Sequence, residues 1–84
     1  MKVTVLVRPK DGILDPQGEA VAHALSQLGF PARGVRVGRV IDVDLDVDSP
    51  DEAERLARDA AEQVLANGLI ERFDVLAADA ATAS

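Results

Sequence analysis

The stretch Val-Arg-Val-Gly-Arg-Val-Ile-Asp-Val-Asp-Leu-Asp-Val-Asp, residues 35–48, decides the fold of this chain. Its apolar side chains stand at odd positions, namely Val35, Val37, Ile41, Val43, Leu45 and Val47. Its carboxylates stand at even positions, namely Asp42, Asp44, Asp46 and Asp48. This period of two predicts a long β-strand whose acidic face contacts water, because unpaired carboxylates are prohibitively costly to bury. An unbroken strand would span about 45 Å at roughly 3.3 Å per residue, so we expect it to bend or to reach a partner.

The dipeptide Gly38-Arg39 interrupts this alternation, because it places a charge on the apolar parity. A β-bulge, a bend or a tight turn would each explain the interruption.

Two elements precede this stretch. Residues 3–7 alternate like a strand, which Pro9 and the pair Asp11-Gly12 end. Asp15-Pro16 then opens a helix, since Asp15 can accept from the unpaired N–H groups of the first turn and Pro16 suits the first helical position. The apolar stripe of this helix is Val21, Ala24, Leu25 and Leu28, and Gly29 ends it.

Two further elements follow it. Ser49-Pro50-Asp51-Glu52 reads as a capping box that starts a second helix, and Asn67-Gly68 ends this helix. Its apolar stripe is Ala53, Leu56, Ala57, Ala60, Val64 and Leu65. A short last strand lies within residues 69–76, and we expect residues 77–84 to form a flexible C-terminal tail.

The predicted fold class is α+β, a two-layer sandwich of order β-α-β-α-β. Residues 1–76 form one domain, with two helices on one face of a mainly antiparallel sheet. Three strands leave two open edges, so we expect dimerisation to extend the sheet.

Composition limits the classes of function. The 84 residues include no cysteine and one histidine, which argues against disulfides and zinc sites. A domain this small is marginally stable alone, so oligomerisation is the remaining source of burial. No apolar run approaches 18 residues and the N-terminus does not resemble a signal peptide, so we expect a cytoplasmic protein without membrane association.

The net charge of −6 argues against nucleic-acid binding. The charge is nevertheless uneven, since Arg33, Arg36 and Arg39 are followed by a run of carboxylates. A basic patch beside an acidic one is a plausible docking surface, and ordinary solvated charge is the alternative.

No motif indicates catalysis, cofactor binding or a metal site. The spacing Asp42-x-Asp44-x-Asp46 resembles a calcium loop, but Val47 stands where that loop needs Gly. The start of the first helix lacks a phosphate-binding glycine pattern, so capping by Asp15 is the better interpretation. His23 has no partner spaced to serve it as a catalytic base.

Three motifs resemble the small S-type subunit (PurS) of bacterial phosphoribosylformylglycinamidine synthase. They are Leu14-Asp15-Pro16-Gln17-Gly18, Val35-Arg36-Val37-Gly38-Arg39 with Arg in place of the family's usual Lys, and Val64-Leu65-Ala66-Asn67-Gly68-Leu69-Ile70-Glu71. The last has Gly68 where the family often has Pro. The resemblance covers residues 1 to about 76, and the order and spacing of the motifs make it specific.

The resemblance implies a non-catalytic bridging subunit of this ATP- and glutamine-dependent enzyme of purine biosynthesis. The implied partners are a second copy of the chain, a large synthetase subunit that uses ATP and Mg, and a glutaminase subunit whose ammonia must reach the synthetase. Candidate contact residues are Asp15, Gln17, Gly18, Arg36, Gly38 and Arg39.

Two other classes of function compete with this one. A regulatory module could bind a small ligand at a dimer interface, and a thermal shift with amino acids or nucleotides would favour it. An enzyme in its own right would turn over substrate as a pure chain, which we do not expect.

Overall fold

The computed structural model describes residues 1–76, and the expected tail at 77–84 lies outside them. The chain forms, in order, β1 (Lys2–Pro9), α1 (Pro16–Gln27), β2 (Arg39–Asp44), α2 (Pro50–Ala60), a π-helical turn η1 (Ala61–Leu65) and β3 (Glu71–Val75). This confirms the predicted β-α-β-α-β order.

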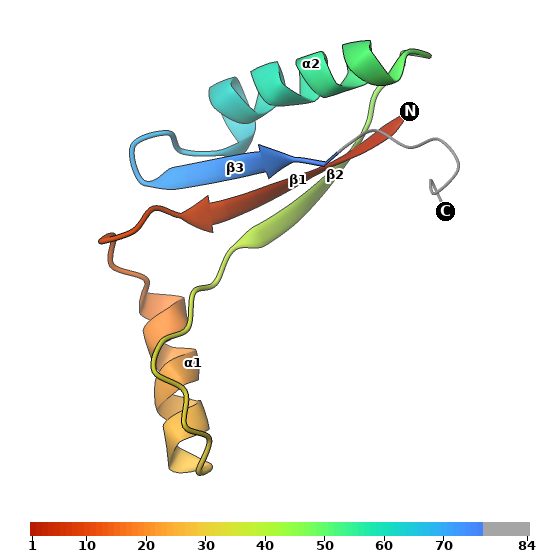
Figure 1. Ribbon diagram of the computed structural model, residues 1–84. Coiled ribbons are helices and arrows are strands. Elements are labelled where there is room, and N and C mark those ends of the chain that lie inside the picture. Colours follow the sequence, from red (N-terminus) through yellow and green to blue (C-terminus); the bar gives the residue numbers. More distant parts are fainter. Residues whose placement is uncertain (77–84) are drawn as a thin grey trace.

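The three strands form one antiparallel sheet in the order β2-β1-β3, as Figure 1 shows. In the central strand, Val5 lies opposite Ile41 on one side and Val75 on the other. Residues that pair in this way share a face of the sheet. The odd-numbered apolar residues of all three strands therefore line one face, and the predicted antiparallel sheet is confirmed.

Helix α2 covers this apolar face (Figure 1). The fully buried core consists of Val3, Val5, Val7, Ala53, Ala57 and Ala61, none more than 1% exposed. The alanines recur every fourth residue and so face the sheet from one side of the helix. Because they are small, the helix can lie close to the valines. The result is a thin core of β-branched and small residues.

The start of α2 follows the capping prediction. The side chain of Ser49 accepts a hydrogen bond from the backbone N–H of Glu52 at 3.4 Å, and Pro50 is the first helical residue. The outer face of α2 carries charge at Asp51, Glu52, Arg55, Arg58 and Asp59, all of which are exposed. Its amphipathic pattern is therefore satisfied within the single chain.

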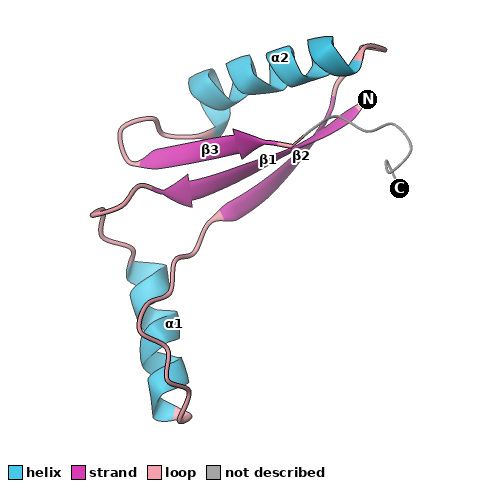
Figure 2. Cartoon of the chain, viewed as in Figure 1, coloured by secondary structure: helices cyan, strands magenta, loops and turns pink. Residues whose placement is uncertain are grey.

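Helix α1 is placed differently from the prediction. We expected both helices on one face of the sheet, but only α2 lies there, and α1 extends beyond the end of the sheet (Figures 1 and 2). The chain leaves β1 at Pro9 and turns through Gly12, whose φ is 82°, before the helix starts. The radius of gyration is 15.9 Å, whereas a compact domain of this length has about 12 Å. The elongated shape follows from this projecting helix.

The regular part of the middle strand is shorter than the acidic pattern suggested. Strand β2 covers Arg39–Asp44, and the odd–even pattern of burial continues to Asp48 although the chain bends at Asp46 and Asp48. Before Arg39 the chain departs from β1 and passes the first turn of α1. A Cβ atom on Gly38 would lie 2.3 Å from the carbonyl oxygen of Val7. The interruption at Gly38-Arg39 is thus the point where the strand leaves the sheet, and glycine permits the close approach.

This contact gives a prediction for stability. Gly38→Ala should lower the free energy of unfolding by about 1–3 kcal/mol, because the added methyl group overlaps backbone that cannot move aside easily. Gly34→Ala is the matched control, since nothing lies within 4 Å of a Cβ at that position. Urea denaturation of both variants checks the prediction, and equal stability of the two would show that residue 38 does not approach Val7.

Candidate functional site

The six candidate contact residues gather at the junction between the sheet and α1. Asp15, Gln17 and Gly18 belong to the start of the helix, and Arg36, Gly38 and Arg39 belong to the segment that enters β2. Two open depressions lie here. Arg36, Gly38 and Arg39 help to line the first, and Asp15, Gln17, Gly38 and Arg39 help to line the second.

Asp15 ties the helix to the strand segment. One carboxylate oxygen accepts from the backbone N–H of Gly18 at 2.9 Å, and the other accepts from the N–H of Val37 at 2.8 Å. Both bonds favour the ionised carboxylate and therefore lower the pKa of Asp15, and the bond from Val37 has the larger effect. The predicted cap is confirmed, and the same side chain also binds a residue 22 positions later.

Gly18 lies where α1 and the segment before β2 come closest. It is buried, and a Cβ atom here would lie 2.2 Å from the carbonyl oxygen of Val35. Only glycine therefore lets the strand segment pass this close to the helix. Gly18 shapes the junction, whereas Gln17 beside it is exposed to solvent.

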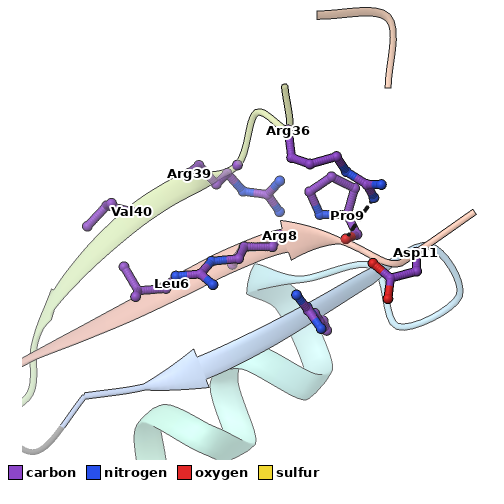
Figure 3. A pocket seen from close by; sticks show the side chains of 10 residues that line it. Leu6, Arg8, Pro9, Asp11, Arg36, Arg39 and Val40 are labelled. Atoms are coloured by element: carbon purple, nitrogen blue, oxygen red, sulfur yellow. Dashed lines mark hydrogen bonds between the residues drawn. The ribbon is translucent and has the colours of Figure 1, made fainter. Parts of the chain in front are cut away.

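Arg36 holds the loop between β1 and α1. Its guanidinium donates to the carbonyl oxygen of Pro9 at 3.1 Å and to that of Lys10 at 2.6 Å. Figure 3 shows Arg36 above Pro9 with the first of these bonds. These two bonds leave part of the five-donor guanidinium available, and the side chain is exposed.

Arg39 is engaged within the chain. It forms a two-pronged ion pair with Glu71 of β3, with N···O distances of 2.6 and 3.0 Å, and it also donates to the carbonyl oxygen of Leu65. This pair lowers the pKa of Glu71 and raises that of Arg39, chiefly through the hydrogen bonds between the two side chains. The carboxylate of Glu71 also accepts from the N–H of Asn67 at 2.8 Å.

Sequence reasoning missed Glu71, because nothing local links it to Arg39. The one available signal was the position of Arg39 on the apolar parity, which implied that its charge needed a partner. The pairing of Arg39 with Glu71 explains how a charge can stand on the face covered by α2.

The acidic positions of the middle strand remain at the surface. Asp42 accepts from the hydroxyl of Thr4 at 2.7 Å, and Asp44, Asp46 and Asp48 are likewise exposed. Within residues 1–76 no group of acidic or histidine side chains is arranged to hold a metal ion. None of the helices in that range is long and apolar enough to cross a membrane.

Helix α1 carries little charge, and large apolar side chains on it and beside its two ends are exposed. Leu14 is 69% exposed, Leu28 74% and Phe30 56%, and Val21 on the helix is also exposed. Glu19 is the only acidic residue of Pro16–Gln27, which contains no Lys or Arg. Within residues 1–76 no helix or strand packs along α1. Exposed large apolar side chains on a helix that no other described helix or strand covers make α1 a candidate site of contact with another molecule.

Comparison with known proteins agrees with this architecture. The family model described as phosphoribosylformylglycinamidine (FGAM) synthase, PurS, matches residues 2–79. The chain belongs to the PurS family. The sequence is 35% identical over 77 residues to phosphoribosylformylglycinamidine synthase subunit PurS of Archaeoglobus fulgidus, covering 90% of this chain and 96% of that protein. It is 42% identical over 74 residues to the Mycobacterium leprae subunit, covering 87% of each.

A solved structure has the same fold. Thermus thermophilus PurS superposes with a TM-score of 0.79 at 36% identity, covering 93% of this chain and 96% of that one. The PurS resemblance drawn from the three sequence motifs is therefore confirmed.

The hydrogen bonds to Asp15 predict that the stability of the protein depends on pH. A carboxylate whose pKa is lowered by folding stabilises the protein above its unfolded pKa of about 4, and this stabilisation is lost as the pH falls through the lower folded pKa. Asp15→Asn should lower the melting temperature at neutral pH and should make its fall below about pH 4 shallower. Part of the fall in melting temperature remains in this variant, because the pKa of Glu71 is also lowered by folding.

Thermal unfolding followed by circular dichroism from neutral to acid pH checks this. Asp46→Asn, which changes an exposed carboxylate of the same chain, is the control and should leave the profile as in the wild type. An Asp15→Asn profile identical to that of the control would contradict the role given to Asp15.

Proposed function

We propose that this PurS-family chain is a non-catalytic bridging subunit of phosphoribosylformylglycinamidine synthase. In this role it helps the glutaminase subunit to associate with the synthetase subunit and to pass ammonia to it. The reaction converts formylglycinamide ribonucleotide, ATP and glutamine to the amidine in cytoplasmic purine biosynthesis. The match over residues 2–79 and the relatives named as subunits of this enzyme support the proposal.

The uncovered surface of α1 is the observation that carries a docking role. The outer face of α2 is highly charged, as expected for a helix that faces water. By contrast, Val21 of α1 and Leu28 just after it are exposed, and α1 contains one acidic residue and no Lys or Arg. Each large apolar side chain is worth about 1.5–3 kcal/mol when fully buried, so covering α1 gives a substantial driving force for association. The absence of charge also removes the desolvation cost that a charged helix would bring to an interface.

A second copy of the chain is the first partner in this proposal. Strands β2 and β3 form the two edges of the sheet, and their unpaired backbone groups can accept a further strand. Self-association would extend the sheet and supply the burial that a thin core of valines and alanines lacks. The proposed assembly is a homodimer or a tetramer.

The junction residues play two different parts in the proposed interface. Asp15, Gly18 and Gly38 fix the direction of α1, and Arg39 pairs with Glu71 of β3. Gln17 and the exposed part of Arg36 can contact a partner. We place ATP and Mg in the large synthetase subunit. This chain contributes binding surface and no catalytic group.

Assembly of the complex tests the proposal. Leu28→Glu should weaken association with the synthetase and glutaminase subunits at least about tenfold, because the interface would have to bury an unpaired carboxylate. Sedimentation velocity measures the complex, and glutamine-dependent synthesis of the amidine measures its function. The pure chain should show no turnover.

Val64→Glu is the matched control, since Val64 is 79% exposed and lies on η1 rather than on α1. It should assemble like the wild type. If Leu28→Glu and Val64→Glu both assembled and supported turnover normally, α1 would not be the docking surface.

A further inference from the structure

Four arginines line the open depression at the end of β1, in a chain whose net charge is −6. They are Arg8, Arg36, Arg39 and Arg72. Figure 3 shows three of them, Arg8 on β1 and Arg36 and Arg39 on the segment that enters β2. The carboxylates nearby are Asp11 in the lining, Glu71, which pairs with Arg39, and Asp74, which lies opposite Leu6 in the sheet. Positive charge therefore exceeds negative charge at this one place on an acidic protein.

Arg8 and Arg72 face each other across the sheet. They are direct partners in the pairing of β1 with β3, and both are exposed. Like charges directly opposite each other destabilise a sheet. Neither side chain has an ion pair or a hydrogen bond with any residue of 1–76, although the rest of this protein is rich in carboxylates. The fold thus places two arginines at paired positions of neighbouring strands, and neither forms an ion pair with a described residue.

Arg36 adds a third guanidinium that is already fixed in position. Its bonds to the carbonyl oxygens of Pro9 and Lys10 use one nitrogen and hold the side chain over the end of β1. A planar guanidinium fixed in this way presents its other N–H groups without a further loss of side-chain entropy. Arg39 contributes less, because Glu71 already occupies it.

We infer that this depression binds a phosphate monoester through Arg8, Arg36 and Arg72. A phosphate group has three acceptor oxygens and up to two negative charges, so it can bind three guanidinium groups from separate segments at once. Bound phosphate would also remove the repulsion between Arg8 and Arg72. Leu6 and Val40, which pair across the sheet, line the same depression and offer an apolar surface to the organic part of the ester.

The lining favours a small ligand over an acidic protein segment. Asp11 shares the depression with the arginines, and it would repel a chain of carboxylates laid across the site. It is also a hydrogen-bond acceptor that a hydroxyl group of an ester can use. This inference does not depend on the proposed function, because the purified chain alone contains every residue of the site.

Calorimetric titration of the purified chain tests it, with inorganic phosphate and glycerol 3-phosphate as probes at low ionic strength, where charge is least screened. Both probes should bind and raise the melting temperature more than chloride at equal ionic strength. Tighter binding of glycerol 3-phosphate would show that Leu6 and Val40 hold the organic part, and equal binding would show that the phosphate group alone is held. Either result supports the site.

Arg8→Gln and Arg72→Gln should each weaken phosphate binding about tenfold or more, and without phosphate each should melt at a higher temperature because the repulsion is gone. Arg55→Gln is the control, since Arg55 is an exposed arginine of α2. Three outcomes would overturn the inference: no binding, equal binding by all three variants, or unchanged phosphate binding by Arg8→Gln and Arg72→Gln with weaker association of the partner subunits. The last result would instead assign the arginines to an acidic protein surface.

Discussion

The carboxylate of Asp15 is the interaction on which the shape of the molecule depends. It accepts one backbone N–H from the helix it caps and another from Val37 on the returning chain, at 2.9 and 2.8 Å. These two bonds join the start of α1 to the segment that enters β2. Gly18 lets Val35 pass close to the helix, and Gly38 lets the same segment meet the end of β1. The direction of α1 is therefore set by a single charged side chain and two residues without a side chain.

This junction divides the chain into two parts that differ in how their apolar residues are buried. The sheet and α2 bury their apolar residues against each other, and the charged face of α2 meets water (Figure 1). Helix α1 has no such arrangement, because Val21 and the adjoining Leu28 are exposed and the helix carries little charge. Packing of α2 on the sheet accounts for the fold, and the exposed apolar residues of α1 account for the need of a partner. A subunit built this way gains stability as it assembles, by mass action.

Local features of the sequence were predictable because local physics determines them. The alternation in residues 3–7 and 35–48 indicated the first two strands, and Ser49 and Asp15 indicated the two helix starts. The pairing of Arg39 with Glu71 and the meeting of Arg8 with Arg72 depend on strand register, which no local pattern specifies. The position of α1 was also missed. Its apolar stripe was interpreted as a face that packs in the core of this chain. Helical periodicity predicts that such a stripe will be buried, but it does not specify whether the same chain or another chain buries it.

Hydrogen exchange of the α1 amides, followed by mass spectrometry, tests the central claim most directly. The chain is measured alone over a range of concentrations and then with the synthetase and glutaminase subunits. Amides of Pro16–Gln27 should exchange much faster than those of α2 in the most dilute sample, and they should become protected on self-association or on addition of the partners. Protection of α1 equal to that of α2 in the dilute chain, unchanged by concentration or partners, would contradict the account.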